Sequence, residues 1–67
     1  MSFRDFTTYV KGFLKKAGED TACVFHNDTE KQRYIAVLAD RCWITGHPSS
    51  RALTVNFGSG HRAIVRV

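Results

Sequence analysis

The sequence has few cysteines that could stabilise a small protein through disulfides, and it has no long apolar run that could anchor it in a membrane. Of its 67 residues, two are cysteines and one is a proline, too few cysteines for a framework of several disulfides. No apolar run approaches the ~18 residues of a membrane-spanning helix, and Lys11, Lys15 and Lys16 interrupt the apolar positions near the start. We therefore expect a cytoplasmic protein that has reduced thiols and does not bind membranes.

Motifs of catalytic and cofactor sites are also missing. The sequence contains no P-loop, no G-x-G-x-x-G motif and no paired acids; Asp28, Glu30 and Asp40 fall in predicted turns, where carboxylates stabilise the turn itself. A cysteine nucleophile would need a histidine and an orienting group beside it, and so short a chain leaves little material for a pocket. We predict that the protein is not an enzyme, has no cofactor and takes no small-molecule substrate.

Two cysteine–histidine pairs raise the alternative of a zinc site. The pairs are Cys23-x-x-His26 and Cys42-x4-His47, and these residue types are the usual ligands of structural zinc. However, Cys23 and His26 fall within a predicted strand, where residues three apart point to opposite faces. No glycine-containing knuckle bends the chain there, so we predict no metal site.

The composition predicts one small, basic, folded domain over residues 1–67. The hydrophobic fraction of 43%, with aromatic residues spread along the chain, favours a packed core over disorder. The net charge of +4 favours approach to nucleic acid or to an acidic protein surface. The basic residues are scattered along the chain, however, and a charge of this size is also ordinary for solubility.

The start of the chain has helical periodicity. Apolar residues at steps of three and four form one stripe, which consists of Phe3, Phe6, Val10, Phe13, Leu14 and Ala17. Ser2 is a candidate N-cap with Asp5 as its capping-box partner, and Gly18 suits the residue that follows the helix. The pattern predicts a helix over residues 3–17, in which Gly12 marks a close approach to the sheet.

From Thr21 onwards the apolar period changes to two, which is typical of strands. Strands are predicted at 22–26, 33–39 and 42–45, with loops at 27–31 and 46–50. Either Asp40-Arg41 forms a tight turn between two strands, or residues 33–45 form one long bent strand. We favour the turn.

The end of the chain predicts a β-hairpin with a defined register. Strands at 52–57 and 61–67 flank Gly58-Ser59-Gly60. A three-residue loop gives the pairs Phe57 with His61, Val55 with Ala63, and Leu53 with Val65. This register puts the apolar residues on one face, as a half-buried sheet requires, whereas a two-residue loop would mix the faces. Gly60 then supplies the left-handed residue of the loop.

The predicted fold class is α+β, with the N-terminal helix packed on one face of a four- to five-stranded antiparallel β meander. One helix cannot cover both faces of the sheet. The covered face is predicted to carry Ile35, Val37, Ile44, Leu53, Val55, Phe57 and Val65. The uncovered face is predicted to carry Tyr34, Leu38, Trp43, Thr54, Asn56, Arg62, Ile64 and Arg66.

The uncovered face is the predicted functional surface. Monomers rarely expose a contiguous apolar patch, and aromatic residues and arginine are enriched in interfaces. The predicted partner-binding residues are Tyr34, Leu38, Trp43, Ile64, Arg62 and Arg66, and they would bind a protein partner or a second copy in a homodimer. Two alternatives stay open: the aromatic and basic residues of the sheet could bind nucleic acid, or the sheet could curl into a small barrel that buries Trp43.

The last third of the chain resembles a group of small phage proteins. The segments that carry the resemblance are Trp43-Ile44-Thr45-Gly46-His47-Pro48-Ser49-Ser50 and Leu53-Thr54-Val55-Asn56-Phe57-Gly58-Ser59-Gly60-His61. They look like short uncharacterised proteins encoded by enterobacterial phages and prophages, a group to which no activity or site residues attach. The resemblance implies a small accessory protein that binds a host protein or a nucleic acid.

Overall fold

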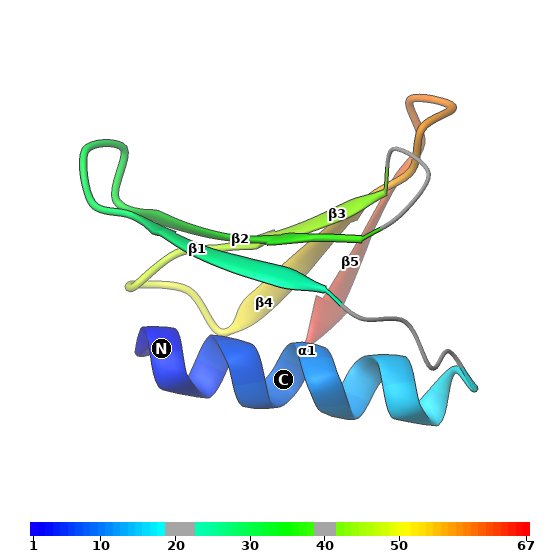
Figure 1. The fold of residues 1–67 in the computed structure, drawn as a ribbon, viewed down its shortest axis with the longest axis horizontal. Coiled ribbons are helices and arrows are strands. Elements are labelled where there is room, and N and C mark those ends of the chain that lie inside the picture. The colour runs from blue at the N-terminus through cyan, green and yellow to red at the C-terminus, as the bar shows by residue number, and fades with distance from the viewer. Residues whose placement is uncertain (19–22, 39–41) are drawn as a thin grey trace.

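The predicted α+β architecture is confirmed by the computed structural model, which describes residues 1–18, 23–38 and 42–67. The elements are α1 (Phe3–Lys16), β1 (Val24–Asp28), β2 (Arg33–Val37), β3 (Trp43–Gly46), β4 (Ala52–Asn56) and β5 (Arg62–Arg66). The five strands lie in the order β1-β2-β3-β4-β5, and each pairs antiparallel with its neighbour in sequence. The sheet is therefore a meander, and α1 lies along one face of it (Figure 1).

The start of α1 is fixed by the predicted capping box. The Ser2 hydroxyl accepts a hydrogen bond from the backbone N–H of Asp5 at 3.0 Å, and the Asp5 carboxylate accepts one from the Ser2 N–H at 3.3 Å. These two bonds satisfy N–H groups that have no partner inside the helix. The helix ends at Lys16, one residue before the predicted boundary, and Gly18 follows with the left-handed φ of 76°.

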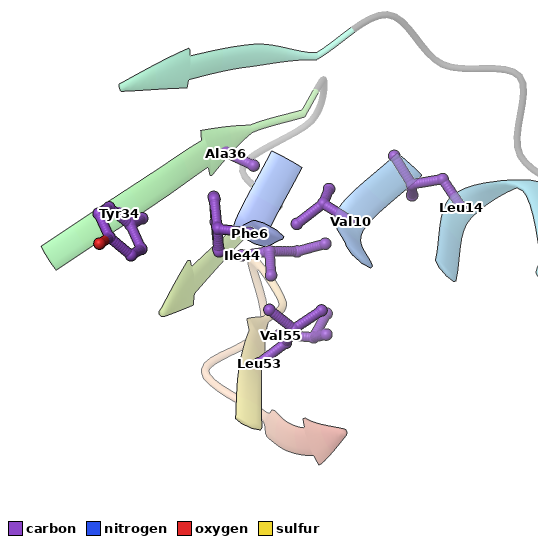
Figure 2. Packing of buried hydrophobic residues seen from close by; sticks show 8 residues of the cluster. All are labelled: Phe6, Val10, Leu14, Tyr34, Ala36, Ile44, Leu53 and Val55. Carbon is purple, nitrogen blue, oxygen red and sulfur yellow. The ribbon is translucent and has the colours of Figure 1, made fainter. Parts of the chain in front are cut away.

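The core forms between one stripe of α1 and the facing side of the sheet (Figure 2). Phe6, Val10 and Leu14 are the buried residues of the helix. The buried apolar residues of the sheet are Tyr34, Ala36, Ile44, Leu53 and Val55. At the centre, the ring of Phe6 lies 5.5 Å from that of Tyr34, centroid to centroid.

Gly46 is the residue that lets Phe6 approach the sheet. A Cβ on Gly46 would lie 2.8 Å from Cδ1 of Phe6, closer than such contacts allow. Gly46 belongs to β3 and pairs with Tyr34, so it is not the loop residue that the sequence suggested. The close approach assigned to Gly12 is wrong, since Gly12 is exposed and a Cβ there would meet nothing within 4 Å.

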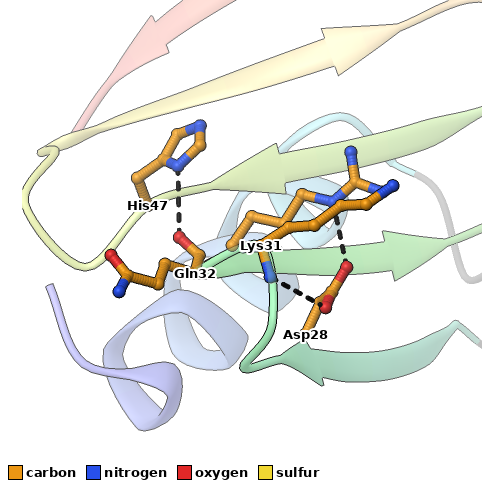
Figure 3. A network of polar contacts seen from close by, with 5 residues as sticks. Asp28, Lys31, Gln32 and His47 are labelled. Carbon is orange, nitrogen blue, oxygen red and sulfur yellow. Dashed lines mark hydrogen bonds and ion pairs between the residues drawn. The ribbon is translucent and has the colours of Figure 1, made fainter.

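The turn between β1 and β2 is held by side chains (Figure 3). The carboxylate of Asp28 accepts hydrogen bonds from the backbone N–H of Lys31 and from Nε of Arg33, each at 3.3 Å. Gln32 takes a left-handed φ of 51°, and its carbonyl oxygen accepts a bond from Nδ1 of His47 at 3.3 Å. Because Asp28 belongs to the strand, the turn begins later than the predicted loop at 27–31.

The link between β2 and β3 reverses the chain. Val37 pairs with Trp43, and the N–H of Leu38 donates to the carbonyl oxygen of Cys42 at 2.9 Å. This antiparallel pairing rules out a single long strand over residues 33–45. The tight turn predicted at Asp40-Arg41 lies outside the described residues.

The register predicted for the last hairpin is confirmed. Leu53 pairs with Val65 and Val55 with Ala63. The N–H of Phe57 donates to the carbonyl oxygen of residue 61 at 2.9 Å, and Gly60 has a φ of 89°. A three-residue loop with a left-handed glycine therefore joins β4 to β5, as the sequence required.

The face assignment of β2 is the main error of the sequence analysis. Tyr34 and Ala36 point toward α1 and are buried, whereas Ile35 and Val37 lie on the opposite face. Both alternating sets of β2 are apolar, so the period of two predicts a strand without saying which set faces the helix. Phe57, also predicted on the covered face, is 44% exposed beyond the end of β4.

Candidate functional site

The candidate site is the sheet face opposite α1, called here the open face. Directly paired strand residues project to the same side, so the register fixes which side chains are neighbours. One row across the sheet runs Val24, Val37, Trp43, Asn56 and Arg62, and the next runs His26, Ile35, Thr45, Thr54 and Ile64. Within the described part of the chain α1 is the one helix, and it lies on the other side (Figure 1).

Large apolar side chains on the open face are accessible to solvent. Val24 is 59% exposed, Val37 43%, Trp43 40% and Ile64 72%. Val24, Val37 and Trp43 occupy adjacent register positions on three successive strands, so they form one continuous patch. Apolar patches of this kind mark interaction sites more often than isolated exposed residues do.

Trp43 belongs to this surface and not to the core. The order of strands is linear, with β1 and β5 as the two edges, so the sheet does not close into the barrel that would bury the ring. Trp43 pairs with Asn56, which is buried and whose Nδ2 donates to the carbonyl oxygen of Trp43 at 3.4 Å. This bond satisfies an amide that lies beside the apolar patch.

Basic side chains line β5 at the edge of the open face, separated from Trp43 by Asn56. Arg62 and Arg66 are exposed on either side of Ile64 in the sequence, and the alternation of the strand puts all three on the open face. Among residues 1–18, 23–38 and 42–67 the one ion pair joins Arg33 to Asp28, at 3.3 Å. The rim of the open face at β5 therefore carries positive charge beside an exposed aliphatic side chain.

The structure places four of the six predicted partner-binding residues on the open face, and they are Trp43, Ile64, Arg62 and Arg66. Tyr34 and Leu38 do not lie there. Tyr34 is 6% exposed in the core and its hydroxyl donates to the carbonyl oxygen of Met1, while Leu38 packs against the core. The prediction that these two residues belong to the uncovered face is wrong.

Three large apolar residues of the open face were missed by the sequence analysis: Val24, Ile35 and Val37. The predicted alternation of β2 assigned Ile35 and Val37 to the helix side, and Val24 was given no role. Once Tyr34 is known to face the helix, strand alternation moves all the odd-numbered residues of β2 to the open face. The alternation of β2 was therefore visible in the sequence, but it was compatible with either set of residues facing the helix.

The environment of Cys23 makes its thiol a weaker nucleophile. Burial raises the pKa of Cys23, although the nearby charge of Lys11 opposes the effect, and a raised pKa leaves less of the nucleophilic thiolate. Cys23 and Cys42 are both free thiols. The described residues contain no group of three or more His, Cys, Asp or Glu side chains that could hold a metal ion.

The comparisons with known proteins leave the surface itself as the guide to function. Neither the family models, nor the curated proteins, nor the solved structures contain a match to this chain. The resemblance to phage proteins stays a prediction. In the described residues no helix has the length and apolar character needed to cross a membrane.

Proposed function

We propose that the chain is a non-enzymatic interaction module that binds a protein partner through the open face of its sheet. The observation that supports this function is the patch formed by Val24, Val37 and Trp43. These side chains adjoin one another on three strands and stay between 40% and 59% exposed. A partner that covered them would remove this apolar surface from water, which favours binding.

Trp43 is the expected anchor of the contact. Tryptophan and arginine are enriched among the residues that carry most of the binding energy in interfaces, usually at the centre of the patch. Trp43 lies on the middle strand of the sheet with Val37 beside it, and Arg62 closes the same row at the edge. The apolar centre and basic rim follow the usual anatomy of a protein interface.

Nucleic-acid binding has weaker support. Proteins that read RNA or DNA on a sheet surface stack two or three bases on exposed aromatic rings. With Tyr34 buried, the described part of the open face offers the ring of Trp43 and, two strands away on β1, the smaller imidazole of His26. Single-stranded nucleic acid can be added as a competitor in the crosslinking experiment described next. If it binds, its affinity should fall steeply as the salt concentration rises.

Site-specific photo-crosslinking from the protein's native cell extract tests the proposal. A photoreactive phenylalanine at Val37 should form a discrete protein adduct, because this position borders Trp43 on the open face. The control position is Tyr9, an exposed aromatic residue of α1, which lies on the other side of the sheet from the open face. An adduct that is resistant to nuclease and specific to the open face supports the proposal. Equal labelling at both positions, or an adduct removed by nuclease, contradicts it.

Replacing Trp43 by Ala separates binding from folding. Because Trp43 lies outside the core cluster, we expect the adduct at Val37 to be lost while the circular dichroism spectrum and the cooperative unfolding transition persist. Light scattering across a dilution series of the free chain shows whether the partner is a second copy. If Trp43→Ala abolished cooperative unfolding, the ring would be structural and the proposal would lose its anchor.

A further inference from the structure

The strand β5 is an edge of the sheet and is largely uncovered. Four of its five residues are exposed, and Val65 alone is partly buried. An edge strand carries a row of backbone N–H and C=O groups with no partner, which can pair with a strand from another chain. The side chains of β5 decide which chain that would be.

The register shows which backbone groups of β5 are free. The N–H of Phe57 donates to residue 61, and the N–H of Val67 donates to residue 51. Hydrogen-bonded and non-bonded pairs alternate in an antiparallel ladder, so Ala63 and Val65 bond to β4 between these two points. The N–H and C=O groups of Arg62, Ile64 and Arg66 therefore point away from β4, toward the outer side of the edge strand, where the described residues place no other strand.

The same three residues supply the side chains next to the free edge. Arg62, Ile64 and Arg66 project onto the open face, and Ile64 is the most exposed large apolar residue of the described chain. An added strand would place its own alternate side chains directly opposite them. Opposite charges and aliphatic pairs stabilise such cross-strand positions, and like charges destabilise them.

We infer that β5 is the docking edge for an extended segment of the partner protein, with acidic side chains opposite Arg62 and Arg66 and an aliphatic one opposite Ile64. The segment adds a sixth strand, antiparallel to β5, by strand augmentation. This inference rests on the proposed function, because the added strand extends the open face and the rest of the partner covers the patch around Trp43.

A second copy of the chain is a poorer occupant of this edge. Two β5 strands paired about a two-fold axis at Ile64 would set Arg62 of each copy opposite Arg66 of the other. Both of these pairs bring together like charges, and each copy carries a net charge of +4. Charge complementarity therefore favours an acidic partner over self-pairing.

The opposite edge, β1, is less suited to an added strand. By the same alternation, counted from the bond between Leu38 and Cys42, its free backbone groups belong to Phe25 and Asn27. The side chain of Phe25 faces α1, and Nζ of Lys11 lies 5.8 Å from its ring centroid. Side chains of a strand added there would meet the helix, whereas the corresponding residues of β5 lie on the open face and are exposed.

The probe is a synthetic peptide with the core Glu-Thr-Ile-Val-Glu, whose antiparallel register places its Ile opposite Ile64. N-methylation of that Ile removes a hydrogen bond to β5 and should weaken binding about tenfold. N-methylation of the neighbouring Val, whose N–H points away from β5, is the matched control and should leave the affinity unchanged. Equal losses from both methylations would overturn the inference.

Charge reversal tests the side-chain part of the inference. The double variant Arg62→Glu with Arg66→Glu should lose the acidic peptide and bind a peptide with Lys in place of both Glu residues. Arg4→Glu with Lys31→Glu makes the same change in net charge at exposed positions away from β5 and should retain the acidic peptide. If both double variants lost the peptide equally, the attraction would be non-specific and the docking edge would be rejected.

Amide hydrogen exchange measures the docking directly on the whole chain. Binding should protect the amides of Arg62, Ile64 and Arg66, while those of Ala63 and Val65 are already protected by β4. If the peptide bound without protecting the amide of Ile64, the inference would be overturned. It would also be overturned if the free chain had twice its expected mass and Ile64 were already protected, because a second copy would then occupy the edge. If exchange fails this test while the open-face crosslink at Val37 persists, the edge is wrong and the proposed function stands; loss of both rejects both.

Discussion

Both faces of the sheet carry large apolar side chains, but these side chains lie in opposite environments. On the covered face Ile44, Leu53 and Val55 are buried against α1, while on the open face Val24, Val37 and Ile64 are exposed. Large apolar side chains therefore occur on both faces, although the open face also carries polar residues such as His26, Thr45 and Thr54. The difference comes from the single amphipathic helix, which has one apolar stripe and can cover one side.

Exposure of the apolar residues on the open face is therefore set by how α1 packs on the sheet and not by the residue types. Strands with apolar residues on both sides are typical of sheets that are covered on both sides. The strand β2 and the patch around Trp43 resemble parts of a sheet that has a second layer, and the described chain supplies one layer. The following predictions test this difference, and they run from the largest expected effect to the smallest.

Truncating one apolar side chain on each face should give the largest contrast. Phe6→Ala removes the ring at the centre of the core and should lower the free energy of unfolding by about 3–5 kcal/mol. Ile64→Ala removes a side chain from the open face and should change it by less than about 0.5 kcal/mol. Urea unfolding measures both, and similar losses would show that the two faces are equivalent in the fold.

Adding a side chain at Gly46, where the ring of Phe6 approaches the sheet, should have the next largest effect. Gly46→Ala places a Cβ 2.8 Å from Cδ1 of Phe6, and overpacking of this kind costs about 1–3 kcal/mol. The smaller side chain of Phe6→Leu should reduce the additional cost of Gly46→Ala. A double-mutant cycle measures this coupling, and strictly additive losses would show that the two residues do not compete for the same space.

A glycine away from the sheet should respond with the opposite sign. Gly12 lies in α1 with nothing within 4 Å of a built Cβ, and alanine is favoured over glycine in helices by about 0.8–1.0 kcal/mol. Gly12→Ala should therefore raise the midpoint of thermal unfolding. A lowered midpoint would indicate that the exposed side of α1 packs against something at this position.

The smallest effect concerns the ion pair at the margin of the open face. The backbone N–H of Lys31, with help from Arg33, lowers the pKa of Asp28. Because this pKa is lower in the folded state than in the unfolded state, the carboxylate stabilises the fold above its unfolded pKa of about 3.9. That contribution is lost as the pH falls through the folded pKa.

Asp28→Asn should remove this part of the acid dependence. Unfolding midpoints of wild type and variant should differ near neutral pH and converge as the pH falls below about 3.9. Asp5→Asn is a useful comparison because it alters the capping box of α1 instead of the turn. A constant difference between wild type and Asp28→Asn at all pH values would show that the hydrogen bonds do not depend on the charge.

Local features of the fold were predictable because short-range geometry decides them. The helix follows from the spacing of Phe6, Val10 and Leu14 and from a capping box three residues apart. The last hairpin follows from the requirement that Leu53 and Val65 share a face and from a glycine at the left-handed position. In each case one local arrangement satisfied the pattern and its alternatives did not.

The candidate site was predictable only in part, because half of it depends on contacts distant in sequence. Trp43, Ile64 and the two arginines of β5 were placed correctly from strand alternation. Tyr34 and Leu38 were misplaced because both sides of β2 are apolar. The phenol of Tyr34 is tolerated in the core since its hydroxyl reaches the carbonyl oxygen of Met1, and no pattern within the strand reports that bond.

The sequence by itself determined the helix, its cap, the meander of short strands and the register of the last hairpin, since these depend on neighbours a few residues apart. The tertiary structure alone decided which side of β2 meets the helix, where Phe6 enters beside Gly46, and which residues remain exposed. Packing made these choices, because a two-sided apolar strand offers two nearly equivalent faces and the fit of one helix selects between them.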